Sequence, residues 1–425
     1  MGISASRERA ALSDARPPNP LDHFQPHTPG FAQNPYPIYE RMQAHQSPLY
    51  YAPFDTWLVS RFADVARLAR DPNLRRTPGD WCTQQQRQEQ LQRDNWHDMP
   101  YHSRFVQFSL LDSDGEVHDR LRRQVFNFFA PGPVAKLRTV VEARANQQLN
   151  DLLSARQPFD FVSQLAADLP GYMIGKLMGV PDEDCALLRL WSERIVQFFD
   201  VDRSTEKKVL AEATTKEFYD YLIHLRRLRR RQPADDLITQ LLQAESAGLL
   251  TEDEFMSTCM LIVMAGHGST QDALGNGLYA LLRHPEQLQR LREEPTLVKS
   301  AVQEMLRFES PLPFFHRFNS IPIGLGGQTF PVGTRFGLLY GAANRDEAAF
   351  ENAARFDIAR RPNRHLALGG GAHFCLGNHL ARLNMEVLLG CLLQHSARIS
   401  LAQDSVHYKL GLSARGLQAL FISVN

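Results

Sequence analysis

Apolar positions recur along most of this chain with the three- and four-residue spacing of amphipathic helices, and only short stretches read as strands. The spacing predicts helices over residues 34–45, 62–70, 118–129, 134–155, 161–178, 182–199, 206–232, 251–283, 296–308 and 380–393. Short β-like pieces, several with glycine turns, are expected at 56–59, 321–327, 330–331 and 335–340. The pattern therefore predicts a mainly α fold with a small segregated β part.

Two stretches depart from this periodicity. Residues 1–33 are polar and rich in proline, which predicts a loose N-terminal arm. Residues 81–104 are rich in Gln, Arg and His, and we expect a long, partly helical loop of the kind that is usually functional or disordered. The basic run 226–231 favours a solvated helix end over a site for an acidic partner.

Composition narrows the class of protein. With 425 residues the chain exceeds the usual size of one core, so length alone suggests two or three domains. Its 47 basic and 47 acidic residues balance, which argues against nucleic acid or an anionic membrane as a partner. We expect a cytoplasmic protein without a signal peptide or membrane anchor, because no long apolar run occurs. The five cysteines are scattered, which argues for a reducing compartment and against disulfides or a zinc cluster.

The most informative stretch is 368–377, where Cys375 stands among glycines just before an apolar helix. A thiolate at a helix start is favoured, because the positive end of the helix dipole and free backbone N–H groups lower its pKa. The glycines allow the backbone to come close to a flat ligand. The arrangement suits an axial thiolate on haem iron. The competing interpretation is a buried cysteine in a glycine turn.

This stretch resembles the cysteine-loop signature of the cytochrome P-450 family, Phe-x-x-Gly-x-His/Arg-x-Cys-x-Gly. Gly371, His373, Cys375 and Gly377 match it, and Leu368 replaces the phenylalanine. The resemblance spans residues 34–424 and implies the cytochrome P-450 fold, with residues 1–33 as an arm and 34–425 as a single haem-thiolate catalytic domain. It also implies haem b as the cofactor and Cys375 as the ligand of its iron.

Two further sets of residues match the family by order and spacing. Glu304 and Arg307 lie one helical turn apart, and by resemblance they form a buried ion network with Arg355 that fixes the cysteine loop. Haem propionates need cationic or hydrogen-bonding partners. By resemblance, these contacts fall on a second set: His118, Arg122, Arg317, His365 and His373.

The predicted helix 251–283 carries the family's oxygen-groove pattern, Ala/Gly-Gly-x-Asp/Glu-Thr, at residues 265–269. By resemblance, Ala265 and Gly266 let the helix pass close to the haem, and an acid and an alcohol deliver protons during oxygen activation. Here Gly268 takes the acid position and Ser269 the alcohol position. Thr270 is an imperfect substitute, because it points about 100° away around the helix. Water or Asp272 is the alternative source of protons.

The resemblance implies a haem-thiolate monooxygenase that oxidises a small organic substrate in natural-product biosynthesis. Electrons would come from a separate ferredoxin or flavodoxin and its reductase, with Arg120 and Arg123 as candidates for the docking face. The missing acid leaves oxidative coupling, cyclisation or peroxide-driven oxidation as an alternative, and a non-catalytic haem-binding sensor or carrier as a third. Residues 81–108 and 198–218 should border the pocket, and their mixed side chains fit an aromatic or polyfunctional substrate.

Overall fold

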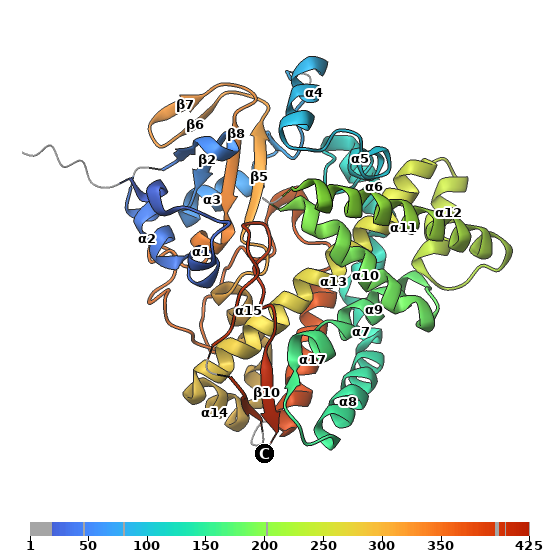
Figure 1. The fold of residues 1–425 in the computed structure, drawn as a ribbon, viewed down its shortest axis with the longest axis vertical. Helices are drawn as coiled ribbons and strands as arrows, with labels where there is room; N and C mark the ends of the chain where they lie inside the picture. Colours follow the sequence, from blue (N-terminus) through green and yellow to red (C-terminus); the bar gives the residue numbers. More distant parts are fainter. Residues whose placement is uncertain are drawn as a thin grey trace, which may run out of the picture.

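The structure is a computed structural model that describes residues 19–45, 47–79, 81–200, 203–395, 399–403 and 405–424. Helices make up most of it, and the strands of the larger sheet gather at one side (Figure 1). The predicted mainly α fold with a small segregated β part is therefore confirmed. None of the described helices is both long enough and apolar enough to cross a bilayer.

The elements follow one another along the chain in three groups. The first group is η1 (Pro20–His23), α1 (Pro29–Gln33), α2 (Tyr36–Ala44), β1 (Leu49–Tyr51), η2 (Ala52–Phe54), β2 (Thr56–Val59), α3 (Phe62–Arg70), β3 (Leu74–Arg75), α4 (Gln84–Arg93), α5 (Pro100–Gln107), α6 (Gly115–Phe126), η3 (Asn127–Phe129) and α7 (Pro131–Lys136). The second group is α8 (Arg138–Ser154), β4 (Phe159–Asp160), η4 (Val162–Ala166), α9 (Asp168–Met178), η5 (Asp182–Asp184), α10 (Cys185–Val196), η6 (Gln197–Phe199), α11 (Thr205–Arg231), α12 (Leu237–Ser246) and α13 (Glu252–Arg283). The third group is α14 (Pro285–Glu293), η7 (Pro295–Leu297), α15 (Val298–Phe308), β5 (Phe314–Asn319), β6 (Ile323–Leu325), β7 (Gln328–Phe330), β8 (Arg335–Leu339), α16 (Tyr340–Ala343), η8 (Gly371–His373), α17 (Asn378–His395), β9 (Ile399–Leu401) and β10 (Phe421–Val424).

The predicted loose arm is wrong for its last part. Residues 1–18 lie outside the described residues, but residues 19–33 contain η1 and α1, each with a proline at its start. The Phe24 and Phe31 rings lie 5.2 Å apart and are only 1% and 5% exposed. They also pack against Tyr51 and Tyr39. The chain therefore joins the folded body before residue 33.

The larger sheet joins segments that are far apart in the sequence. In the described part of the chain it has five strands, in the order β1-β2-β8-β5-β3. β2 pairs in parallel with β8, and the other neighbours are antiparallel. The register sets His316 opposite Gly337 and Phe318 opposite Arg335. A smaller sheet brings β4, β10 and β9 together.

The helix α13 runs through the middle of the helical part (Figure 1). It begins with a capping box, because Thr251 Oγ1 accepts from the Glu254 N–H and the Glu254 carboxylate accepts from the Thr251 N–H. It packs against α5, α9, α10, α15 and α17, so most of its side chains are buried. A helix held on so many sides is a rigid support for the residues that it presents.

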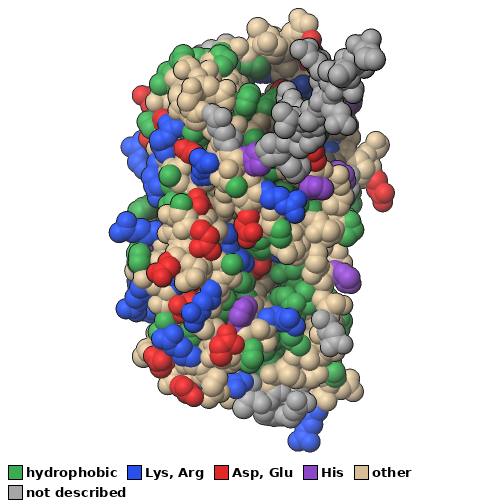
Figure 2. Space-filling view, turned by 90° about the vertical axis from the view of Figure 1, so that its left-hand side faces the viewer, with side chains coloured by type: hydrophobic (Ala, Val, Ile, Leu, Met, Phe, Trp, Pro, Cys, Tyr) green, Lys and Arg blue, Asp and Glu red, His purple; other side chains and the backbone are tan. Residues whose placement is uncertain are grey.

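The outer surface carries both signs of charge. Figure 2 shows basic and acidic side chains interspersed on the side that carries the larger sheet. This mixture is consistent with the equal numbers of basic and acidic residues in the sequence.

Candidate active site

The segment around Cys375 is folded tightly against α3. Gly369 and Gly371 have φ values of +72° and +66°, which glycine adopts without strain. A Cβ atom at Gly371 would lie 2.7 Å from the carbonyl oxygen of Ala69, so the backbones approach too closely for a side chain. The Cys375 N–H donates to the Leu368 carbonyl at 2.9 Å. The cysteine is thus held at a fixed place three residues before α17.

The sulfur of Cys375 has several groups around it that favour the thiolate. Burial raises the pKa of the Cys375 thiol, while the Gly377 N–H and the guanidinium groups of Arg122 and Arg382 act in the opposite direction. The sequence predicted a lowered pKa, and the net direction is opposite because burial is the largest effect. One N–H and two cations nevertheless act on this partly buried sulfur in the direction that favours the thiolate, which is the environment that a thiolate ligand requires.

Cationic and imidazole side chains gather beside this segment. The rings of His118 and His373 have their centroids 4.4 Å apart, and His118 is 2% exposed. His373 Nε2 lies 3.3 Å from Asp114 Oδ1, and Arg122 Nη2 donates to the Phe374 carbonyl at 2.7 Å. Helix α6 and the cysteine segment therefore meet through the predicted residues His118, Arg122 and His373.

Arg317 is a buried cation of this group. It is 4% exposed, and its Nη1 donates to the carbonyl of His316 at 2.9 Å. Burial and, to a smaller extent, the charge of the neighbouring Arg76 together lower the pKa of Arg317 to about 10. A buried guanidinium in such a place calls for an anionic partner. The donor set therefore fits a group with carboxylates at its edge and a metal that takes a thiolate, as haem does.

The structure does not bring His365 to this group, which departs from the predicted propionate contact. Its Nε2 lies 3.2 Å from Gln303 Oε1, and its Nδ1 accepts from the Ala367 N–H. Burial lowers the pKa of His365 to about 3, and the cations that act on it are Arg382 and Arg307. Both ring nitrogens are used within the protein, so the side chain ties the cysteine segment to α15.

The pair Glu304 and Arg307 lies at the centre of a buried network. Two nearly parallel bonds join Arg307 Nε and Nη2 to the Glu304 carboxylate, at 2.8 and 2.7 Å, and both side chains are fully buried. Arg307 also donates to the carbonyls of Asn344, Ala353 and Arg355. The pair therefore fixes the backbone that precedes the cysteine segment.

The predicted third member of this network is corrected. The Arg355 side chain is exposed, and only its carbonyl oxygen takes part. Arg360 donates through Nε to Glu304 Oε1 at 3.2 Å, and Asn363 donates to Glu304 Oε2 at 3.1 Å. The sequence reasoning missed Arg360, because no helical or strand spacing connects it with Glu304.

On α13, the predicted oxygen groove has an open side. Ala265 is exposed although it lies in the middle of a largely buried helix, and a Cβ atom at Gly268 would meet nothing within 4 Å. Ser269 Oγ donates to the carbonyl oxygen of Ala265 at 3.0 Å. These three residues therefore line one open stretch of the helix. α17, which follows Cys375, packs against α13.

The other predicted groove residues face elsewhere. A Cβ atom at Gly266 would lie 2.5 Å from Cδ1 of Ile174, so this glycine permits the close packing of α9 and not a groove. Thr270 is buried at 5% exposure. Asp272 accepts from Lys409 Nζ at 2.7 Å, and burial raises the pKa of its carboxyl. Gly266 and Thr270 are thus packing residues, and Asp272 is held by the C-terminal segment.

Asp114 and Arg76 are site residues that sequence reasoning missed. Asp114 accepts from the Arg76 and Thr77 N–H groups as well as from His373. Arg76 pairs with Asp112 at 3.0 Å and donates to the carbonyl of His316. The signal was weak, because Arg76 follows a strand of two residues and neither residue belongs to a motif of the sequence.

The segments expected to border the substrate meet in an aromatic cluster. The Trp96 ring packs against Phe198, Phe199 and His102, with centroids 5.1–6.1 Å apart across the cluster that these four side chains form. His102 is 0% exposed, and neither of its ring nitrogens has a hydrogen-bond partner. Burial and, to a smaller extent, the charge of Arg203 together lower the pKa of His102 to about 4.

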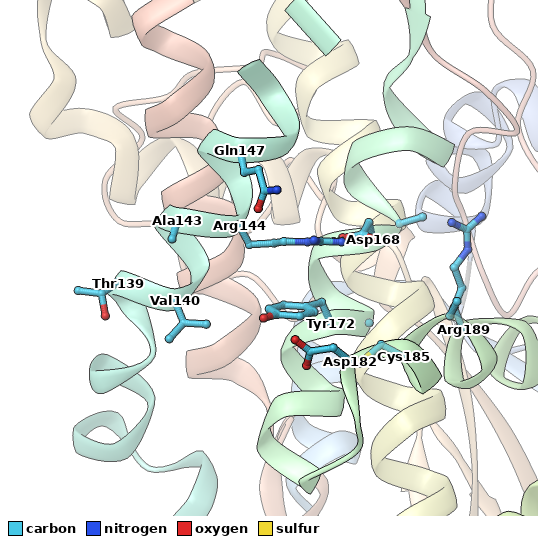
Figure 3. A pocket seen from close by; sticks show the side chains of 13 residues that line it. Thr139, Val140, Ala143, Arg144, Gln147, Asp168, Tyr172, Asp182, Cys185 and Arg189 are labelled. Atoms are coloured by element: carbon cyan, nitrogen blue, oxygen red, sulfur yellow. The ribbon is translucent and has the colours of Figure 1, made fainter. Parts of the chain in front are cut away.

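A separate groove of about 630 Å³ lies between α8, α9 and α10 (Figure 3). Arg144 and Asp168 pair beside it at 2.8 Å, and Tyr172 lies below the Arg144 guanidinium. Its lining residues include none of the predicted site residues. The groove is therefore distinct from the cysteine site.

Comparisons with known proteins agree on one family. The cytochrome P450 family model matches residues 189–405. The biotin biosynthesis cytochrome P450 of Bacillus subtilis (strain 168) is 32% identical over 395 residues, which cover 92% of this chain and 96% of that protein. The polyketide biosynthesis cytochrome P450 PksS of the same organism is 32% identical over 413 residues, with coverage of 95% and 98%.

A solved structure shows the same fold. The crystal structure of P450BioI in complex with hexadec-9Z-enoic acid ligated acyl carrier protein matches with a TM-score of 0.85 and 31% identity. The match covers 93% of this chain and 100% of that chain.

Proposed function

The chain belongs to the cytochrome P450 family of monooxygenases, and from that premise we propose that it oxidises a small organic substrate in natural-product biosynthesis. The reaction uses haem b, O2 and electrons from a ferredoxin or flavodoxin with its reductase. The single observation that carries this proposal is the glycine-rich segment that fixes Cys375 before α17, with Arg122 bound to the carbonyl of the preceding Phe374. The names of two relatives, which refer to biotin and polyketide biosynthesis, support the biosynthetic setting.

We propose that Cys375 ligates the haem iron and that His118, Arg122, Arg317 and His373 hold the propionates. Arg317 supports this assignment because it is a buried cation with spare donors. When bound, thiolate-ligated haem activates dioxygen and transfers an oxygen atom to an organic substrate. Gly377 keeps the backbone beside the sulfur free of a side chain.

Ser269 is the proposed proton-handling residue. Its hydroxyl proton is donated to the Ala265 carbonyl, which fixes the direction of the O–H group beside the open stretch of α13. Gly268 leaves room beside it for ordered water, because a Cβ atom there would meet nothing within 4 Å. Proton transfer needs a donor within hydrogen-bond reach, and Ser269 with water can supply one.

An electron donor can approach the cysteine segment from the surface. Phe374, the residue before Cys375, is 36% exposed, and Arg123 on α6 is exposed as well. Arg120 is less available for docking than the sequence suggested, because its Nη1 donates to Glu254 Oε2 at 3.0 Å. Arg123 and Phe374 are therefore the proposed contacts for the redox partner.

A second candidate function is oxidative coupling, cyclisation or peroxide-driven oxidation on the same haem. It is favoured by Gly268, which stands where most of the family has an acid, and by Asp272, whose carboxylate is bound to Lys409. Such reactions bypass part of the usual proton route.

We also propose that residues 34–425 form one catalytic domain. The main hydrophobic cluster includes residues from Ala32 to Ile422, and within it α13 contacts helices from both halves of the chain. Residues 19–33 add to this domain through Phe24 and Phe31.

The proposed function is tested with purified, haem-loaded protein, a surrogate ferredoxin and its reductase. A substrate screen by the haem absorption shift identifies binders, and product analysis follows. The proposal predicts NADPH-dependent formation of a product that contains one oxygen atom from O2. Binding without any turnover, with NADPH or with peroxide, would contradict both candidate functions.

A further inference from the structure

Two partly buried arginines outside the set assigned to the propionates lie near one another. Arg203 follows η6, and Arg335 is the first residue of β8. Burial lowers the pKa of both guanidinium groups. For Arg335 the attraction of Asp94 opposes this shift, and the nearby cations Arg203 and Arg76 add to it. The two arginines therefore act on one another in one partly buried region.

Arg335 has a buried donor without an acceptor. Its Nη1 donates to the carbonyl oxygen of Phe54 at 3.3 Å, but its Nε is buried and has no hydrogen-bond partner. Buried donors are nearly always paired in native proteins, and an unpaired one calls for a partner that the chain does not supply. Arg203 is also loosely held, because its Nε donates to the Phe198 carbonyl at 3.3 Å.

The strand register places His316 on the same side of the sheet as Arg335. Arg335 pairs with Phe318, and residues two apart on a strand face the same side. The rings of His316 and Phe318 lie 5.5 Å apart. The charges that act most strongly on His316 are those of four guanidinium groups: Arg76, Arg335, Arg317 and Arg203. Arg76 is paired with Asp112 and Arg317 is assigned to a propionate, so Arg335 and Arg203 are the cations beside His316 that are left for a further anion.

The protein's own carboxylates leave this positive region incompletely neutralised. Asp112 pairs with Arg76 at 3.0 Å. Asp200, which acts on Arg203, accepts from the backbone N–H groups of Leu412 and Ser413. Asp94 lies 3.8 Å from Arg203 Nη1 and acts on Arg335 as well. Asp94 thus acts on both arginines, while Asp200 adds to its effect on Arg203 and Asp55 to its effect on Arg335. The Asp94–Arg203 distance is longer than that of a close hydrogen bond.

An apolar wall adjoins these cations. The Arg203 guanidinium lies 5.3 Å from the centroid of the Trp96 ring, which belongs to the aromatic cluster with Phe198 and Phe199. A ligand with an apolar body and an anionic end would match such a boundary. The groove in Figure 3 differs, because its Arg144 already has Asp168 as a close partner.

We propose that Arg335, with Arg203 and His316, forms an anion-binding site that receives the carboxylate of an organic-acid substrate. The inference rests on the proposed function and names the class of its substrate. The unpaired Arg335 Nε would donate to one carboxylate oxygen, and Arg203 would supply the second charge. The apolar body of the acid would lie along the aromatic cluster, with the carboxylate anchored at the β5–β8 sheet.

The test measures binding to the haem-loaded protein by the absorption shift, with acids and their matched alcohols as probes. Dodecanoic acid is compared with dodecan-1-ol, and 4-phenylbutanoic acid with 4-phenylbutan-1-ol. The wild type is expected to bind at least one acid about ten-fold more tightly than its alcohol, as expected for a charge-assisted hydrogen bond. Arg335→Gln should lose this preference while its affinity for the alcohol stays the same.

Matched variants keep the result interpretable. Arg203→Gln should show a weaker preference for the acid over its alcohol than the wild type. Arg335→Lys should keep part of the preference that Arg335→Gln loses. Arg144→Gln, in the separate groove, should keep the wild-type preference. Haem content and thermal midpoint are compared first, because a variant that loads haem normally is folded. If Arg335→Gln fails to load haem, the inference is tested by the preference for the acid over its alcohol in Arg203→Gln and Arg335→Lys.

Equal binding of acid and alcohol by the wild type would overturn the inference, and so would an unchanged preference in both Arg335→Gln and Arg203→Gln. A further titration with inorganic phosphate distinguishes a free anion from a substrate carboxylate. If phosphate raises the thermal midpoint in an Arg335-dependent way while acids show no preference, the site binds a free anion and the substrate assignment is wrong. Failure of the proposed function is recognised separately, by the lack of a thiolate-type spectrum in the reduced, carbon monoxide-bound wild type.

Discussion

Ser269 and Gly268 are the residues on which the proton chemistry of this protein depends. Ser269 Oγ is directed at the Ala265 carbonyl, and the neighbouring Gly268 opens onto free space. We expect Ser269→Ala to increase the share of reducing equivalents lost as peroxide, because the remaining water loses a fixed neighbour. The quantity to measure is product formed per NADPH consumed.

Two controls define this prediction. Thr270→Val changes a buried side chain that faces away, and it should leave coupling unchanged. Gly268→Asp places a carboxylate where space is available, and it should lower peroxide loss. Unchanged coupling and rate in Ser269→Ala would show that Ser269 carries no protons and would favour the coupling or peroxide-driven alternative.

His102 makes stability depend on pH. Burial, with the help of Arg203, lowers its pKa from 6.5 to about 4, so the folded protein keeps the ring neutral in a window where the unfolded chain binds a proton. The free energy of unfolding therefore falls as the pH falls from about 6.5 to 4, by up to about 3 kcal/mol. We expect His102→Phe to remove this part of the pH dependence.

The measurement is the midpoint of denaturant unfolding between pH 7.5 and 4.5. His102→Phe should gain stability relative to the wild type as the pH falls, since a phenyl ring suits the surrounding aromatic side chains and leaves no unpaired nitrogen. His224→Gln, an exposed position on α11, is the control. Parallel pH profiles for wild type and His102→Phe would contradict the assignment.

The contact between two residues could be predicted where their short spacing on one helix determines it. Glu304 and Arg307 lie three residues apart on one helix, so their contact follows from helical geometry. Arg360, Asn363 and the pairing of His365 with Gln303 were not predictable, because they depend on how the chain folds back after β8.

At the scale of elements, α15 is coupled to the cysteine segment by its buried ion pair. Arg307→Ala leaves the Glu304 carboxylate without its closest partner and frees the carbonyls of Asn344 and Ala353. The loss should be about 3–5 kcal/mol, because a buried charge is left uncompensated. We expect little haem-loaded protein from Arg307→Ala or Glu304→Ala, measured as haem per protein and as thermal midpoint.

Arg355→Ala is the matched control for this pair. It removes an exposed side chain and keeps the carbonyl that accepts from Arg307, so its haem content should equal that of the wild type. Normal haem content and stability in both Arg307→Ala and Glu304→Ala would refute the structural role of the network.

Elements with a strong local pattern were predicted well, and those defined by distant partners were not. Helix α3 was predicted with its observed bounds, because its apolar face is clear and a polar residue ends it on each side. β3 has only two residues and exists through its pairing with Asn319 and Phe318. Helices α12 and α14 were not predicted, because the spacing of their apolar residues resembles that of several other segments of the chain.

At the scale of the whole molecule, the N-terminal segment belongs to the domain that holds the site. Phe31 is 5% exposed and packs against Phe24 and Tyr39. We expect Phe31→Ala to lower stability by about 3–5 kcal/mol, because the cavity it leaves cannot fully collapse. Circular dichroism and haem absorbance should report one shared, shifted unfolding transition.

The control for this experiment is Phe126→Ala, which truncates an exposed ring and should change stability little. If Phe31→Ala unfolds a separate part while the haem signal stays at its wild-type midpoint, residues 19–33 do not belong to the same cooperative unit. The sequence predicts a loose arm here because the segment is polar and rich in proline, but in the structure two of these prolines begin helices.

The central claim is that Cys375 supplies a thiolate to haem iron. The most direct measurement is the absorption spectrum of the reduced, carbon monoxide-bound protein, compared between wild type and Cys375→His. The account predicts that the wild type absorbs at the position typical of thiolate ligation and that Cys375→His, with haem still bound, loses this band. A Cys375→His protein that keeps the thiolate-type band would contradict the account.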